Sequence, residues 1–190
     1  MREGKSKVLK KQEIERLLVV AGSERHGLRN QCLIHFSFLL GLRAKEMASL
    51  KIDDLVDSTG KVVEVFYLQS QQTKGNNGRA IYLTNKKLRK KLSEYLKTRE
   101  NDLNRWLFAN QKEGHFDPNT LQQLFKRLYT KAGIEGASSH SGRRSFATNL
   151  ISKGFDIKSV SVLMGHRSIQ TTARYIQENP KMLGQMVAGL

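Results

Sequence analysis

The sequence predicts a mainly α domain that carries one small antiparallel β-sheet, an α+β fold. Apolar residues recur at helical spacing along most of the 190-residue chain. One stretch, residues 61–83, is instead rich in β-branched and aromatic residues and is interrupted by the turn-forming run KGNNG. The apolar fraction of 38% is enough for one core, and the length suits a single domain.

The individual helices are predicted from apolar spacing and from residues that begin or end helices. Aspartate and threonine cap the start of a helix, whereas glycine commonly follows its end. An apolar tail, residues 179–190, follows the predicted domain of residues 1–178. The predicted helices and their boundary residues are 10–21, 26–40 ended by Gly41, a short one carrying Lys45, Glu46 and Leu50, one from Thr84 to about Arg99, 118–132 capped by Asp117, 141–153 ended by Gly154, one from Asp156 to Met164, and one from Ser168 through Tyr175.

The charge predicts a polyanionic partner. Lys and Arg number 33 against 17 Asp and Glu, which gives a net charge of +16 spread along the chain. A broad positive surface of this kind favours nucleic acid. No apolar run approaches the roughly 20 residues of a membrane span, and the basic N-terminus is not followed by a signal-peptide core. We therefore expect a cytoplasmic protein without a membrane partner.

Metal and disulfide chemistry find little support in the sequence. Cys32 is the single cysteine, and its apolar neighbours predict a buried structural thiol. Metal-binding motifs such as HExxH or an EF-hand loop are missing from the sequence. Asp53, Asp54 and Asp57 cluster between a helix and the first strand, where turn and cap roles are favoured over a two-metal site. We expect no metal and no cofactor.

Two candidate cations in the first half of the chain each have an ordinary interpretation and a functional one. Arg43 is either a surface residue paired with Glu46 three positions later or a guanidinium held for a phosphate. Lys74 on the predicted hairpin is either a solvated lysine or a proton donor, because neighbouring arginines would lower its pKa.

The second half of the chain holds the other candidates. His140 and Arg143 form an HxxR at the start of a predicted helix, where the backbone amides favour an anion. Arg144 lies about 100° further round that helix, so it is a phosphate contact or a solvated charge. His166 follows a helix-ending glycine, and Tyr175 lies nine residues beyond it. A phenol with a pKa of about 10 needs nearby cations before it can act as a nucleophile.

Five motifs in a fixed order carry a family resemblance. They are GLRAKE at 41–46, TKG at 73–75, HSGRRSFAT at 140–148, LMGH at 163–166 and TTARY at 171–175. Together they resemble the catalytic domain of the tyrosine recombinases, the phage integrase family. The resemblance runs from about Lys10 to Ile176, and it implies that residues 1–178 are such a catalytic domain.

The resemblance implies a set of roles for cutting and rejoining double-stranded DNA without metal or ATP. Arg43 and Arg143 would clamp the scissile phosphate, and Glu46 would support Arg43. Lys74 would protonate the leaving 5′ oxygen, while His140 and His166 would assist proton transfer. Tyr175 would be the nucleophile that forms a 3′-phosphotyrosyl link. Further contacts with DNA are expected from Lys45, Arg79, Arg144, Arg167 and Arg174.

The chain departs from the family pattern in two ways. Gly142-Arg143-Arg144 stands where Leu-Arg-His is usual, which alters the packing behind Arg143. The usual N-terminal DNA-binding domain is not expected, so the chain is a truncated form or a short member, similar in size to the fimbrial phase-variation invertases. The resemblance also implies a tetramer on paired DNA sites, in which the 179–190 tail would dock on a neighbour or pack on its own domain.

Two other functions stay open at this point. One is a non-catalytic DNA-binding protein on the same fold, and the other is a nicking-closing enzyme similar to type IB topoisomerases. The complete set of catalytic residue types argues against the first of these, because a passive binder has no need of a phenol beside four cations.

Overall fold

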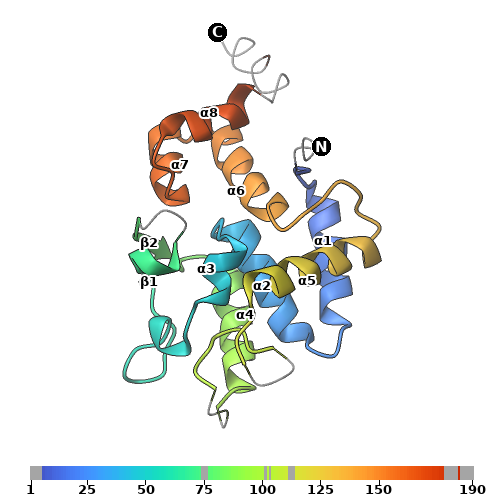
Figure 1. The fold of residues 1–190 in the computed structure, drawn as a ribbon, viewed down its shortest axis with the longest axis vertical. Helices are drawn as coiled ribbons and strands as arrows, with labels where there is room; N and C mark the ends of the chain where they lie inside the picture. Colours follow the sequence, from blue (N-terminus) through green and yellow to red (C-terminus); the bar gives the residue numbers. More distant parts are fainter. Residues whose placement is uncertain are drawn as a thin grey trace.

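Helices form most of the molecule, and a two-stranded sheet lies at one side (Figure 1). The computed structural model describes residues 6–73, 77–100, 102, 104–110, 114–177 and 184. The elements are α1 Lys11–Gly22, α2 Gly27–Leu39, α3 Ala44–Ala48, β1 Val65–Leu68, β2 Arg79–Tyr82, α4 Lys86–Lys97, α5 Pro118–Lys131, α6 Ser141–Ser152, α7 Ile157–Met164 and α8 Ile169–Gln177, with short 3-10 turns at Ile52–Asp54 and Ser70–Gln72. The predicted α+β fold is confirmed.

Helix α2 is the centre of the core. It contacts α1, α4 and α6, and its apolar residues Leu33, Ile34 and Phe36 are fully buried. Cys32 is buried with them, and this burial raises the pKa of its thiol to about 12. The predicted role of a buried structural thiol is confirmed, because such a thiol is not reactive at neutral pH.

The sheet is the predicted antiparallel hairpin. Phe66 of β1 pairs with Ile81 of β2, and both side chains point into the core. Tyr67 and Tyr82 point outward and are 66% and 50% exposed. This alternation is the expected pattern for a sheet with one buried face. The hairpin tip at residues 74–76, which includes Lys74, lies outside the described residues.

The predicted helix that carries Lys45, Glu46 and Leu50 is shorter than expected, because α3 ends at Ala48 and leaves Leu50 outside it. The other helix boundaries agree with the predicted caps in all but one case. Asp117 accepts hydrogen bonds from the amides of Asn119 and Thr120, at 3.0 and 3.2 Å. Asp156 caps α7 by accepting from the amide of Ser159 at 2.8 Å. The predicted Thr84 cap of α4 is wrong by one residue: Asn85 caps this helix, and its Oδ1 accepts from the amide of Leu88 at 3.1 Å. Both residue types can cap a helix, so the sequence alone did not decide between them.

The acidic cluster serves local structure. Asp54 accepts from the backbone amide of Lys51 at 2.8 Å, and Asp57 holds a turn by accepting from the amides of Thr59 and Lys61. Asp53 pairs with Arg105. Within the described residues, no group of three or more His, Cys, Asp or Glu could hold a metal ion.

Two further expectations concern membranes and the C-terminal tail. Across the described part of the chain, no helix combines the length and the apolarity that a bilayer crossing needs. The predicted tail at 179–190 lies outside the described residues apart from Gly184.

Candidate functional site

The turn between α2 and α3 places Arg43 and Glu46. Gly41 reverses the chain with a φ of 64°, and the extended Arg43 then precedes the first residue of α3. Glu46 reaches back and accepts from the Arg43 backbone amide and from its Nη1, both at 2.8 Å. The Glu46 side chain is fully buried, whereas 19% of the Arg43 side chain is exposed. Glu46 therefore fixes Arg43 in place, while part of the Arg43 side chain stays exposed.

Arg79 approaches the same carboxylate from strand β2. Its Nη1 donates to Oε1 of Glu46 at 2.8 Å, and its Nη2 donates to Oε2 at 2.9 Å. Its Nε donates to the backbone oxygen of Leu163 at 3.1 Å, near the end of α7. The Arg79 side chain is only 6% exposed. Arg79, expected as a DNA contact, is therefore a buried residue whose guanidinium binds Glu46 and the Leu163 backbone.

Glu46 is ionised despite its burial. Burial alone would raise the pKa of its carboxyl group, but hydrogen bonds and charge from Arg79, charge from Arg143 and the Arg43 amide together lower it to about 2. A buried carboxylate needs this kind of compensation, because an unpaired charge in the interior is costly.

Arg143 comes to this cluster from the first turn of α6. Its Nη1 donates to the backbone oxygen of Gly41 at 2.6 Å, and its Nη2 donates to the backbone oxygen of Met164. The same Nη1 lies 3.9 Å from Oε2 of Glu46. Burial and the charge of Arg43 lower the Arg143 pKa, yet a guanidinium stays protonated at neutral pH.

Gly142 explains how Arg143 reaches this position. A Cβ atom at Gly142 would lie 2.0 Å from Oγ of Ser37 and 2.8 Å from its Cβ, so α6 and α2 are in close backbone contact there. The leucine that is usual at this position would not fit at this helix spacing. The departure from the family pattern thus lies at a point where the two helices are in close contact.

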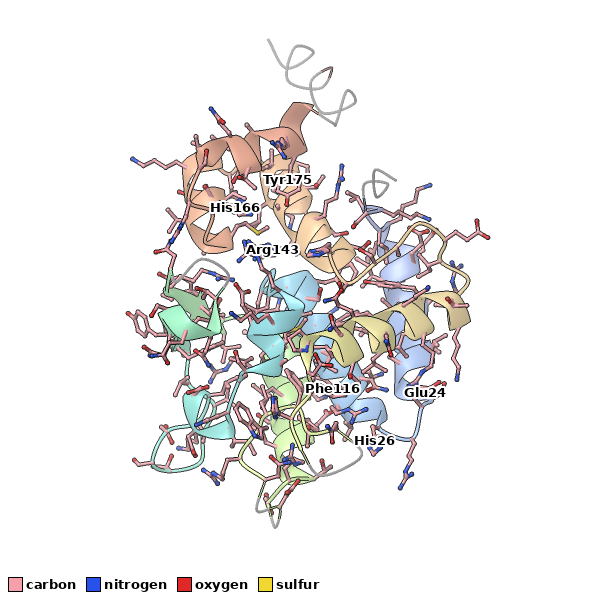
Figure 2. All side chains as sticks on the ribbon, in the orientation of Figure 1. Glu24, His26, Phe116, Arg143, His166 and Tyr175 are labelled. Carbon is pink, nitrogen blue, oxygen red and sulfur yellow. The ribbon has the colours of Figure 1, made fainter. Side chains whose placement is uncertain are left out.

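His166 and Tyr175 complete the cluster, and Figure 2 shows both at the same end of the molecule as Arg143. Gly165, with a φ of 60°, ends α7 and turns the chain so that His166 follows. The Nδ1 atom of His166 lies 2.8 Å from Oγ1 of the buried Thr172. The rings of His166 and Tyr175 are 6.3 Å apart between centroids. Thr172 lies one turn before Tyr175 on α8, so it connects the imidazole to the helix that carries the phenol.

The imidazole of His166 is neutral at neutral pH. Burial and the charges of Arg143, Arg43 and Arg79 lower its pKa to about 4. A neutral imidazole with one nitrogen held by Thr172 can accept or donate a proton at its other nitrogen.

The other predicted residues within the described chain lie next to these residues in the sequence or within one helical turn of them. His140 is exposed at the N-cap of α6, three residues before Arg143. Lys45 is exposed, and its Nζ donates to the backbone oxygen of Thr73 at 3.3 Å. Arg144 is half-buried, whereas Arg167 and Arg174 are exposed.

Sequence reasoning missed two connections in the site. It did not pair Arg79 with Glu46, although Arg79 shares the inward face of β2 with Ile81 and period-2 alternation could have indicated this. It also did not identify Thr172, whose position three residues before Tyr175 places both on one helix face.

Comparison with known proteins identifies the family. The model of the phage integrase family matches residues 7–182. A tyrosine recombinase XerA of Pyrococcus furiosus is 29% identical over 95% of this chain and 60% of its own length, and a tyrosine recombinase XerD of Listeria monocytogenes is 32% identical over 91% and 58%. The chain thus spans about three fifths of the length of these relatives.

Solved structures agree with the sequence comparison. A crystal structure of XerA recombinase superposes with a TM-score of 0.81 at 26% identity and covers 98% of this chain and 65% of that one. The XerH site-specific recombinase, bound to a palindromic difH substrate in a post-cleavage complex, gives a TM-score of 0.71 at 29% identity over 88% of this chain and 48% of that one. With a family match over most of its length and this shared fold, the chain belongs to the phage integrase family.

Proposed function

We propose that this chain performs the strand cleavage and rejoining of a site-specific DNA recombinase, with Tyr175 as the nucleophile. The observation that carries the proposal is the placement of the Tyr175 phenol beside the neutral imidazole of His166, with Arg43 and Arg143 gathered around the buried carboxylate of Glu46. The relatives named tyrosine recombinases, and a relative whose structure is a post-cleavage complex with DNA, support the same reaction.

The proposed reaction is a transesterification at a DNA phosphate that positively charged side chains stabilise. The oxygen of Tyr175 attacks the phosphorus, the bond to the 5′ oxygen breaks, and a 3′-phosphotyrosyl link and a free 5′-hydroxyl result. Arg43 and Arg143 stabilise the negative charge that develops on the non-bridging oxygens, so no metal is required. Attack by a 5′-hydroxyl reverses the step, and the phosphotyrosyl bond conserves the energy that rejoining needs.

Proton transfer is assigned to three residues. His166, neutral in its present surroundings, accepts the phenol proton, and His140 assists at the phosphate. Lys74 protonates the leaving oxygen. Replacing that oxygen by sulfur gives a leaving group that needs no proton, so Lys74→Ala is expected to be far less impaired on the sulfur-substituted DNA. Equal impairment on both substrates would reduce Lys74 to a phosphate contact.

DNA binding and assembly complete the proposal. The exposed Lys45, Arg167 and Arg174, together with Arg144, contact the DNA backbone, and the reaction takes place in the cytoplasm of a bacterial, phage or mobile-element host. We expect a tetramer on paired sites, with the 179–190 tail docked on a neighbouring subunit. Light scattering on DNA tests this: a chain that lacks residues 181–190 and still assembles as well as the full chain contradicts tail docking.

The decisive experiment is covalent capture on DNA. Duplexes from a random-sequence library, each nicked so that the cleaved product escapes, are incubated with the chain and denatured, and the protein-linked DNA is enriched over several rounds. The chain is expected to form an adduct that Tyr175→Phe abolishes without loss of DNA binding. Tyr82→Phe, which removes an exposed phenol from the sheet, is the matched control and keeps the adduct. An adduct that persists in Tyr175→Phe, or is absent from the wild-type chain, overturns the proposal.

A further inference from the structure

The buried carboxylate of Glu46 has no hydrogen-bonding capacity left over. A carboxylate offers about four lone-pair positions. Oε1 accepts from Arg43 Nη1 and Arg79 Nη1, and Oε2 accepts from the Arg43 amide and Arg79 Nη2, at distances of 2.8–2.9 Å. Arg79 supplies half of these four hydrogen bonds in the planar, two-pronged geometry that suits a guanidinium.

Arg143 is a third cation beside this carboxylate, close enough for an ion pair but without a hydrogen bond to it. Its Nη1 lies 3.9 Å from Oε2, too far for a hydrogen bond. Its hydrogen bonds go instead to two neutral partners, the backbone oxygens of Gly41 and Met164, so Glu46 compensates its positive charge only from a distance. A short rotation of the guanidinium would bring it onto Glu46 if lone pairs were open.

We infer that Arg79 is a positioning residue that saturates Glu46 and thereby keeps Arg143 from being captured by this carboxylate. The inference rests on the proposed function, in which Arg143 must meet the phosphate. Together Arg43, Arg79 and Arg143 bring three positive charges to one negative charge on Glu46. Without Arg79, the Glu46 carboxylate binds Arg143. The site then loses one unit of positive charge, and Arg143 is no longer placed to bind the phosphate.

A purely structural role for Arg79 predicts something different. Its contact with the Leu163 backbone also anchors the end of α7, and the loss of that contact would harm the fold whatever residue stood at position 46. The substitution Glu46→Gln separates the two roles, because a neutral amide has no charge with which to capture Arg143. Glutamine can still complete the cap of α3, since it occurs in capping boxes as glutamate does.

The test uses the nicked duplex enriched by covalent capture with the wild-type chain, and it measures single-turnover adduct formation and DNA binding separately. Arg79→Met is expected to lower the cleavage rate about 10²-fold, the size of losing one charge-stabilising group, with DNA affinity little changed. The double variant Arg79→Met, Glu46→Gln is expected to regain about tenfold of that loss through coupling between neighbouring residues.

Arg89→Met is the matched control. Arg89 is a half-buried arginine on α4 that donates to three neutral partners, the backbone oxygens of Val62, Val63 and Leu83. Its replacement removes hydrogen bonds beside the same sheet, so the thermal stability falls, while cleavage per folded molecule is retained.

The outcomes are distinct. If wild-type chain forms no adduct, the proposed function fails. If wild-type chain cleaves and Arg79→Met cleaves equally well, or Glu46→Gln gives no recovery in its background, the saturation role of Arg79 is wrong. If Arg79→Met does not fold, the same comparison is made with Arg79→Lys, whose single ammonium leaves Glu46 partly unsaturated; recovery on adding Glu46→Gln supports the role, and no recovery overturns it.

Discussion

Both ends of the described structure bury guanidinium groups, but the protein groups that bind these guanidiniums differ between the two ends. At the end labelled by Phe116 and His26 in Figure 2, Arg29 is 7% exposed and lies 5.0 Å above the ring of Phe116. It donates to the backbone oxygen of Ala109 at 2.8 Å and to Asn30. Nearby, Arg99 donates to the backbone oxygens of Asn104 and Leu107, at 2.8 and 3.0 Å.

The end that carries Arg143, His166 and Tyr175 uses its arginines differently. Arg43 makes hydrogen bonds to a single side chain, Glu46, and keeps 19% of its own side chain exposed. Burial of an arginine is therefore not a sign of catalysis in itself. The distinguishing feature is a fully buried carboxylate, Glu46, that accepts from both Arg43 and Arg79 and leaves 19% of the Arg43 side chain exposed.

Replacing Arg43 by alanine gives the largest effect expected from this comparison. The loss of one charge-stabilising group at the phosphate costs about 10²–10³-fold in rate, so Arg43→Ala is expected to reduce adduct formation by this factor. The fold should be retained, since Glu46 keeps Arg79 as a partner. Thermal melts and single-turnover cleavage check this. A variant with unchanged cleavage would place Arg43 among the solvated surface charges.

Replacing Arg99 by alanine is the opposite experiment, with an intermediate effect. Arg99 donates hydrogen bonds to the backbone oxygens of Asn104 and Leu107 and thereby holds the segment that follows α4. Leaving these carbonyls unsatisfied lowers the free energy of unfolding by on the order of 3 kcal/mol. Denaturant unfolding of Arg99→Ala should show this loss, while cleavage per folded molecule below the unfolding transition stays near the wild-type rate. A large loss of cleavage in fully folded Arg99→Ala would mean that the two ends are coupled.

The same contrast explains what the sequence could predict. Helix positions, the hairpin and the buried Cys32 follow from local spacing and caps, and the structure agrees with them. Arg79 was expected as a DNA contact because its charge is visible in the sequence, whereas its partner Glu46 lies 33 residues away and meets it only in the folded chain. The order of the five motifs indicated the family, but not that Gly142 lets α6 approach Ser37 of α2.

Removing divalent metal is expected to have the smallest effect on cleavage, and it tests whether acidic residues take part in the reaction. Two-metal nucleases need carboxylates that converge on the ions. At the candidate site, the carboxylate of Glu46 is taken up by Arg43 and Arg79. Asp54 and Asp57 hold backbone amides elsewhere, and Asp53 pairs with Arg105.

Because the proposed mechanism takes the positive charge at the phosphate from side chains, cleavage in excess EDTA should stay within about twofold of the untreated rate. The captured duplex and single-turnover adduct formation measure this, with a magnesium-dependent nuclease in the same buffer as the control for chelation. Complete inhibition by EDTA that Mg²⁺ reverses would contradict the cationic mechanism. It would return Asp53, Asp54 and Asp57 to consideration, and alanine substitutions at these three positions would then identify the metal ligands.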